Sequence, residues 1–156
     1  MASALSPHAL SELIGSIYDC ALDPARWEQT IADLMDAFSG RTAMLHLADL
    51  REHRFLINKS VGIEPHQLEA DARHLPEINA FFAQVLATKP SLDEPIVVSR
   101  DLSRDVIEAS PYFRECVTPY GIVDILQYFL MHTPTRFAVV GFSRHEEHGV
   151  ITEREI

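Results

Sequence analysis

The sequence predicts an α+β fold with a central antiparallel sheet of about five strands and helices on both faces. Strand candidates come in pairs joined by short turns, which is typical of antiparallel hairpins. The two longest candidates, Ile122–His132 and Thr135–Arg144, carry apolar side chains at both odd and even positions. A strand that is apolar on both faces needs cover on both faces. We therefore expect the terminal helices on one face of the sheet and the middle helices on the other.

Two helices are predicted at the start of the chain. Ser6-Pro7 and Asp23-Pro24 each place a capping residue before a proline, the arrangement that begins a helix. Apolar residues then recur at helical spacing in both segments, and Ser39-Gly40 ends the second one. The short connection between the two segments predicts an antiparallel helical hairpin.

The middle of the chain contains a strand pair, two helices and a long connection. A charged turn joins the strand candidates, and each helix candidate begins at a proline. The connection that follows has room for one short strand. In chain order these segments are the strands Thr42–Asp49 and Arg54–Ser60, the helices Pro65–Arg73 and Pro76–Ala87, the connection Lys89–Asp105 and the short strand Ile96–Ser99.

A third capped helix begins at Ser110-Pro111 and is expected to end before Pro119-Tyr-Gly121. The two long strands follow as a hairpin around Pro134. Near the end of the chain, Thr152-Glu-Arg-Glu has the composition of a helix start, with a capping hydroxyl and acidic residues in the first turn. We expect that helix to continue, so residues 1–156 are predicted to form one domain of a longer protein.

Bulk composition narrows the class of protein. The 156 residues are 47% hydrophobic, enough for a real core, and no apolar run is long enough to span a bilayer. The first residues lack the features of a signal peptide, and Cys20 and Cys116 fit reduced packing residues, so we expect a cytoplasmic protein without membrane contact. The net charge of −10 predicts no appreciable binding of duplex DNA by this chain alone.

No pattern in the chain supports catalysis or a metal site. His145 and His148 are three residues apart, whereas the zinc-protease pattern needs histidines four apart on one helix. Nothing near Cys116 would activate its thiol, and no glycine-rich phosphate loop is present. The mixed-charge run from Arg100 to Glu108 fits a solvated helix face. We therefore predict no catalytic residues, no metal and no cofactor.

Aromatic residues give the one candidate binding site. Several cluster between Tyr112 and Phe129, and they fill either an ordinary core or a cavity between the sheet and the middle helices. Both alternatives stay open, because the strand register cannot be read from the sequence. If a pocket exists, its predicted border is Met44, His46, Phe82, Tyr112, Phe113 and Tyr128.

Three phrases of the chain resemble the N-terminal regions of bacterial LuxR-type transcriptional regulators. They are Leu13-Ile-Gly-Ser-Ile-Tyr-Asp-Cys-Ala-Leu-Asp-Pro-Ala-Arg-Trp27, Ser110-Pro-Tyr-Phe-Arg114 and Pro119-Tyr-Gly-Ile-Val-Asp124. The strand residues Phe142-Ser-Arg144 and the later Thr152-Glu153 also match that pattern. The resemblance covers nearly the whole chain, and its motifs mark packing and turns rather than chemistry.

The resemblance implies a PAS- or GAF-like sensor domain that precedes a helix-turn-helix missing from this chain. It further implies a homodimer and DNA contacts made only through the missing C-terminal domain. The function expected is signal sensing, with a small apolar molecule as the possible ligand; the alternative is a ligand-free dimerisation module. A homoserine-lactone ligand is disfavoured, because the single tryptophan, Trp27, lies on an N-terminal helix expected to pack behind the sheet.

Overall fold

The computed structural model describes residues 5–89 and 91–156. Residues 1–4 and Pro90 lie outside the described residues. Residues 1–4 belong to the N-terminus predicted to lack a signal peptide, and Pro90 belongs to the expected connection Lys89–Asp105. The predicted fold class is confirmed: a five-stranded antiparallel sheet in the order β2-β1-β5-β4-β3 carries helices on both faces. The strands are β1 Thr42–Asp49, β2 Arg54–Val61, β3 Ile96–Val97, β4 Ile122–His132 and β5 Arg136–His145.

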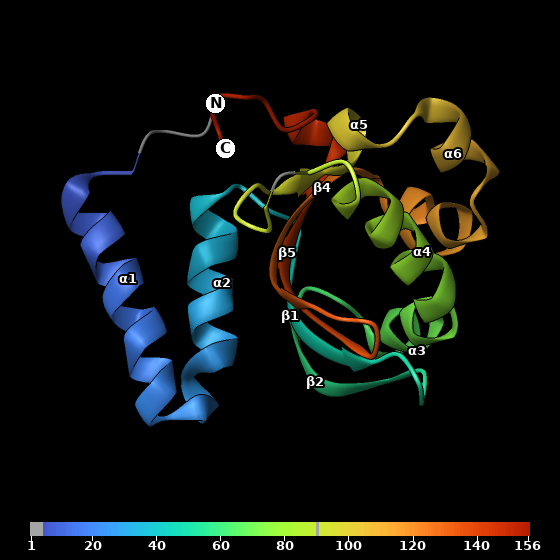
Figure 1. Ribbon diagram of the computed structural model, residues 1–156. Helices are drawn as coiled ribbons and strands as arrows, with labels where there is room; N and C mark the ends of the chain where they lie inside the picture. The colour runs from blue at the N-terminus through green and yellow to red at the C-terminus, as the bar shows by residue number, and fades with distance from the viewer. Residues whose placement is uncertain (1–4, 90) are drawn as a thin grey trace.

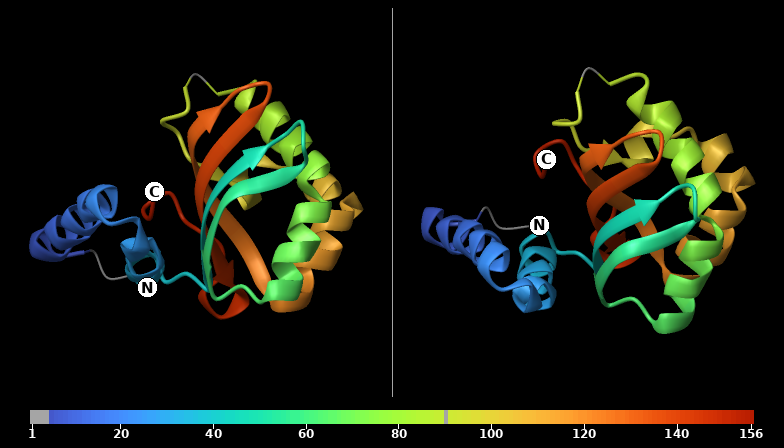
Figure 2. Two further views of the ribbon diagram at one scale, coloured as in Figure 1. Left: turned by 90° about the horizontal axis from the view of Figure 1, so that it is seen from below. Right: turned by 60° about the horizontal axis from the view of Figure 1, so that its bottom comes forward.

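The helices form the outer layers, as Figures 1 and 2 show. The hairpin of α1 and α2 lies on one side of the sheet, and α3 to α6 lie on the other. Only α2 of the hairpin meets the sheet, whereas α1 lies outside it. The helices are α1 Pro7–Leu22, α2 Trp27–Ala37, α3 Pro65–Arg73, α4 Leu75–Leu86, α5 Val98–Asp101 and α6 Arg104–Ala109.

The strand register assigns the buried side chains of the sheet to one of its two faces. On the central strand β5, Val139 pairs with His46 of β1 and with Phe129 of β4, and these three side chains face α3 and α4. The alternate residues, such as Phe142, face the other way and pack with Ile31 of α2. Because successive side chains of a strand point to opposite faces, each core takes every second residue.

The buried carboxylate of Asp124, near the start of β4, joins three parts of the fold. Its side chain is 1% exposed and accepts hydrogen bonds from the backbone of Ser99 and Ile151 (both 2.9 Å) and from the Ser99 hydroxyl (2.6 Å). Ser99 belongs to α5, and Ile151 belongs to the C-terminal segment. One buried carboxyl group therefore holds an edge helix, a strand and the C-terminal segment together.

Two local predictions need correction here. The short strand ends at Val97, because the Ser99 backbone N–H bonds to Asp124 instead of continuing the ladder. The segment after Ser110-Pro111 forms a π-helical turn, Phe113–Val117, and a 3-10 turn, Thr118–Tyr120, rather than a regular α-helix. Gly121 ends it with φ +66°, the left-handed region that glycine tolerates best.

The expected helix at Thr152 is present only as a turn. The backbone N–H of Thr152 donates to the Glu155 carboxylate at 2.9 Å, and the Thr152 hydroxyl donates to the same oxygen at 2.7 Å. The first contact is the acidic half of a capping box, so the residues interact as the sequence pattern indicates. The turn lies against the body of the protein through Arg144, which contacts Glu155 at 2.7 Å.

No helix within residues 5–89 and 91–156 is both long enough and apolar enough to cross a bilayer. The longest, α1, has 16 residues, fewer than the roughly 20 that a spanning helix requires.

Replacing Asp124 tests its joining role. We expect Asp124→Ala to lower the free energy of unfolding by about 3–5 kcal/mol, because it leaves several buried N–H donors without an acceptor. Ser99→Ala removes a single hydroxyl contact and should cost about 1 kcal/mol. Urea denaturation followed by circular dichroism measures both values. Equal losses for the two variants would contradict the role assigned to Asp124.

Candidate functional site

Three small cavities adjoin one another between the sheet and the helical layer of α3 and α4. Each has a volume of about 20 Å³, and all three are bordered by Tyr112, which lies just after α6. A space of this size holds little more than a water molecule. The cavities therefore mark a plane along which the sheet and the helical layer are incompletely packed.

The structure brings most of the predicted site residues together at these cavities. Met44, His46, Phe82 and Tyr112 line the first one. Phe113 lines the second cavity, where it again meets Phe82 and Tyr112. Whether these residues bind a ligand stays a prediction.

Tyr128 does not belong to this group, which corrects the predicted border. Its side chain lies on the opposite face of the sheet and packs in the core that contains Ile31 and Phe142. Its neighbour Gln127 faces the cavities instead. The sequence offered no way to choose between them, because both faces of β4 are apolar and a shift of one residue exchanges the faces.

Gln127 is thus a site residue that the sequence analysis missed. It is 6% exposed, and it pairs with Gly141 on β5, which in turn pairs with Met44 on β1. A Cβ at Gly141 would lie 3.1 Å from Cγ of Gln127 and 3.4 Å from Cγ of Met44. Glycine therefore lets Met44 and Gln127 pack directly over the backbone of β5 at this point of the cavity floor. A polar amide in the mainly apolar middle of β4, between Leu126 and Tyr128, was the sequence feature that marked Gln127.

His46 supplies a second polar group on the floor. It is 4% exposed, and its ring lies 4.4 Å from that of Phe55, centroid to centroid. Burial lowers the pKa of His46 to about 4, so the ring is neutral at pH 7. Neither Nε2 of His46 nor Oε1 of Gln127 has a hydrogen-bond partner.

The opposite wall contains an acid. Asp71 of α3 is 8% exposed and borders two of the cavities. Burial raises the pKa of Asp71 to about 6, although the neighbouring Cys116 thiol opposes the shift. Burial likewise raises the pKa of Cys116 to about 12 and holds that of Tyr112 well above its ordinary range. Burial therefore makes the ionised forms of Asp71, Cys116 and Tyr112 unfavourable.

A polar network at the edge of the cavities positions Tyr112. The Glu77 carboxylate of α4 accepts a hydrogen bond from the Ser110 hydroxyl and one from the Tyr112 backbone N–H at 3.3 Å. His74 lies between two acids, 3.1 Å from Glu77 and 3.0 Å from Glu115. These contacts tie the start of α4 to the turn that carries Tyr112 and Phe113.

The charge of the lining limits what the cavities can accept. None of the described residues that border the three cavities is a lysine or an arginine. An anion placed there would have no cation to pair with, and burying an unpaired charge is strongly unfavourable.

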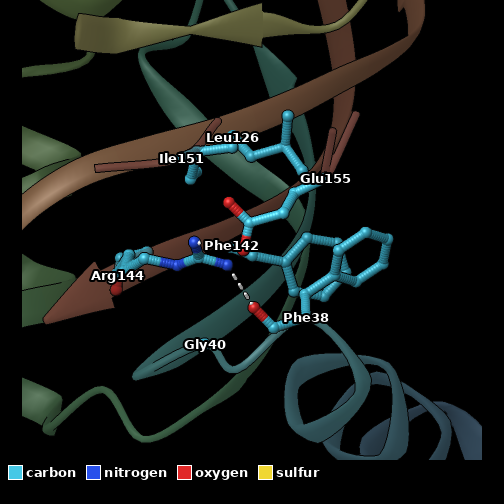
Figure 3. Close-up of a pocket in the computed structure, with 8 residues that line it drawn as sticks. Phe38, Gly40, Leu126, Phe142, Arg144, Ile151 and Glu155 are labelled. Carbon is cyan, nitrogen blue, oxygen red and sulfur yellow. Dashed lines mark hydrogen bonds and ion pairs between the residues drawn. The ribbon is translucent and has the colours of Figure 1, made fainter. Parts of the chain in front are cut away.

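A separate hollow of about 10 Å³ lies on the opposite face of the sheet (Figure 3). Arg144, 5% exposed, donates a hydrogen bond to the carbonyl of Phe38 at 2.6 Å and pairs with Glu155 at 2.7 Å. The Phe38 ring stacks on Phe142 with centroids 5.0 Å apart. These contacts join the end of α2, strand β5 and the C-terminal turn, so the hollow is a structural junction rather than a binding site.

The fold is similar to that of two solved structures. The ligand-binding domain of VqsR from Pseudomonas aeruginosa superposes with a TM-score of 0.66 at 16% identity, over 94% of this chain and 84% of that chain. CepR2 from Burkholderia cenocepacia, an N-acylhomoserine-lactone-dependent LuxR family transcription factor, gives 0.58 at 16% identity with the same coverage. No protein-family model matches the sequence. No curated protein sequence matches it either. The TM-scores establish a shared fold, and at 16% identity the likeness shows the fold alone.

The acid in the cavity wall predicts an unusual dependence of stability on pH. The pKa of Asp71 in the folded protein, about 6, exceeds its ordinary value of 3.8. The folded state therefore binds more protons between these values, and the contribution of Asp71 to stability is lost as the pH rises through them. We expect Asp71→Asn to match the parent near pH 4 and to exceed its free energy of unfolding by roughly 2–3 kcal/mol at pH 7.5.

Urea denaturation across this pH range measures the difference between the two proteins. The neutral His46 gives the opposite slope, because its pKa is lowered, but it is present in both proteins and cancels in the difference. A difference that stays constant from pH 4 to pH 7.5 would show that Asp71 is not strained by burial.

Proposed function

We propose that this chain is the signal-sensing, regulatory domain of a LuxR-type transcriptional regulator, and that a small, mainly apolar ligand binds between the sheet and the helical layer. The observation that supports this most is the set of polar and ionisable groups facing the cavities. His46, Asp71 and Gln127 are each costly to bury, and perturbed groups of this kind concentrate at functional sites. The fold shared with a ligand-binding domain adds to the argument.

Ligand binding then requires the cavities to open. At about 20 Å³ they are far smaller than the roughly 300–1,000 Å³ of ordinary ligand pockets, so the helical layer must move away from the sheet. The polar network of His74, Glu77 and Ser110 lies within that layer, where it ties the start of α4 to the turn that carries Tyr112. A ligand that binds only the open arrangement shifts the population toward it by its differential affinity.

Strand β4 connects the cavity to the C-terminal segment. Strand β4 carries Gln127 at the cavity and, three residues earlier, Asp124. The Asp124 carboxylate accepts a hydrogen bond from the backbone N–H of Ile151. A displacement of β4 therefore changes the anchoring of the segment that would lead to an output domain. In this proposal DNA is bound only by that domain, and the regulatory effect is a coupling free energy between the two.

A catalytic role has no support in the site. The thiol of Cys116 borders one of the cavities, and burial raises its pKa to about 12. A thiol with that pKa is protonated at pH 7 and unreactive. We therefore propose a binding role without catalysis.

The alternative function is that of a dimerisation module, and the exposed face of α1 favours a dimer in either case. Leu10, Ile14 and Ile17 recur at helical spacing and are between 39% and 49% exposed. Tyr18 beside them is 74% exposed. Because α1 packs on α2 and stands away from the sheet, this apolar face is free to meet a second copy of the chain. We propose a homodimer formed through it.

Native mass spectrometry tests the sensing proposal. We expect the protein, purified from cells that supply the ligand, to retain one small molecule that denaturing conditions release. Gly141→Ala should reduce the bound fraction, because its new methyl group displaces the lining side chains of Gln127 and Met44, whereas Gly15→Ala, whose new methyl group meets nothing within 4 Å, should not. Retention of no molecule, together with no stabilising compound in a thermal shift screen, would favour the dimerisation module.

Light scattering tests the dimer. We expect twice the chain mass for the parent and the single-chain mass for the double variant Leu10→Glu and Ile14→Glu, because buried unpaired charges oppose association. Leu130→Glu places the same charge on an apolar residue that is 62% exposed and lies on β4, so it serves as the matched control. Dimers that survive the double change would move the interface away from α1.

A further inference from the structure

We infer that the cavity beside His46 and Gln127 recognises an uncharged aromatic molecule that carries a hydroxyl or N–H donor. This inference rests on the proposed sensing function and specifies the chemical class of the ligand. It depends on the two unpaired polar atoms, on the charge of the lining and on the rings that surround the space.

Unpaired buried polar atoms are uncommon in folded proteins and call for an explanation. Within the described part of the chain only four buried side-chain atoms lack a partner, and two of them, Nε2 of His46 and Oε1 of Gln127, belong to residues lining the same cavity. The two residues come from strands on either side of β5. Both side chains are more than nine-tenths buried, so solvent does not satisfy them.

Each atom asks for a particular partner. Oε1 of Gln127 is an acceptor and needs a donor. The ring of His46 is neutral, so its Nε2 is a donor or an acceptor according to the tautomer. A hydroxyl group both donates and accepts, which makes it the simplest group to pair with either residue. An N–H group only donates, so it pairs with Gln127, or with His46 when Nε2 is the acceptor.

The lining excludes anionic ligands. No lysine or arginine borders the cavity, and its one acid, Asp71, would repel a carboxylate or a phosphate. The ligand is therefore expected to be neutral at the position where it meets His46 and Gln127.

Ring-bearing side chains surround the same space. Phe82 and Phe137 meet edge to face with centroids 5.9 Å apart, and the rings of His46 and Phe55 are tilted at 4.4 Å. Tyr112 completes the ring-lined wall. An aromatic ligand can extend these edge and offset contacts, whereas an aliphatic chain gains only apolar contact. Opening of the helical layer over Met44 and Gln127 would admit a flat ring.

Three matched probes test the class of ligand. They are 4-ethylphenol, which donates and accepts, 4-ethylanisole, which only accepts, and 4-ethylbenzoate, which is charged at pH 7. We expect isothermal titration calorimetry to show binding of the phenol at least tenfold tighter than that of the anisole, and no binding of the benzoate. Equal affinities for phenol and anisole, preference for the benzoate, or no binding of the phenol would each overturn the inference.

Two variants assign the contact to the residues. His46→Phe and Gln127→Met keep side-chain size and remove the unpaired atoms, so each should leave the melting temperature unchanged or raise it. Each should also weaken 4-ethylphenol at least tenfold. Tyr128→Phe removes a hydroxyl on the opposite face of the sheet and should leave the affinity for 4-ethylphenol unchanged. Wild-type affinity in both site variants would refute the assignment to His46 and Gln127.

The result is separable from the test of the sensing function. A retained molecule that is anionic or lacks a ring would leave the sensing function standing and overturn this inference. Absence of any retained molecule, with no compound that stabilises the protein, would count against the sensing function itself.

Discussion

The rest of the structure depends on the burial of both faces of the sheet. Strand β5 is central, and its side chains alternate between the core under α2 and the core under α3 and α4. Neither helical layer alone could cover an apolar sheet of this kind, so both must dock. The α2 side has a hollow of about 10 Å³ beside Phe142, whereas the other side has three adjoining cavities of about 20 Å³ each. This asymmetry places a potential binding site on one face and a structural junction on the other.

The cavity side carries polar groups that a core selected for stability alone would not keep. Neutral His46, unpaired Gln127 and an Asp71 whose pKa is raised by burial all reduce the net stability of the folded state. Natural proteins commonly accept such losses where a site has to bind something. Asp124 and Arg144 are also buried, but unlike His46 and Gln127 they have hydrogen-bond partners for their side chains.

These satisfied charges also relate the site to the C-terminal segment. Asp124 holds Ile151 and Arg144 holds Glu155, and the two residues lie on neighbouring strands, β4 and β5, that also carry the cavity floor. In the proposed mechanism, a movement of those strands reaches the C-terminal segment through these hydrogen bonds. Such a connection suits a two-state regulatory element.

The sequence by itself determined the class of fold and the position of the long elements. Capped helix starts and the two-faced apolar pattern of β4 and β5 are local properties, and they predicted the hairpins and the two helical layers. Only the tertiary structure decided which residues meet. Gln127, and not Tyr128, faces the cavities, because the face of each residue depends on the pairing between strands. Ser99 lies outside the predicted strand, because its backbone N–H donates to the distant Asp124 carboxylate. Likewise, the raised pKa of Asp71 and the free Nε2 of His46 follow from burial by residues far away in the chain, which no local pattern records.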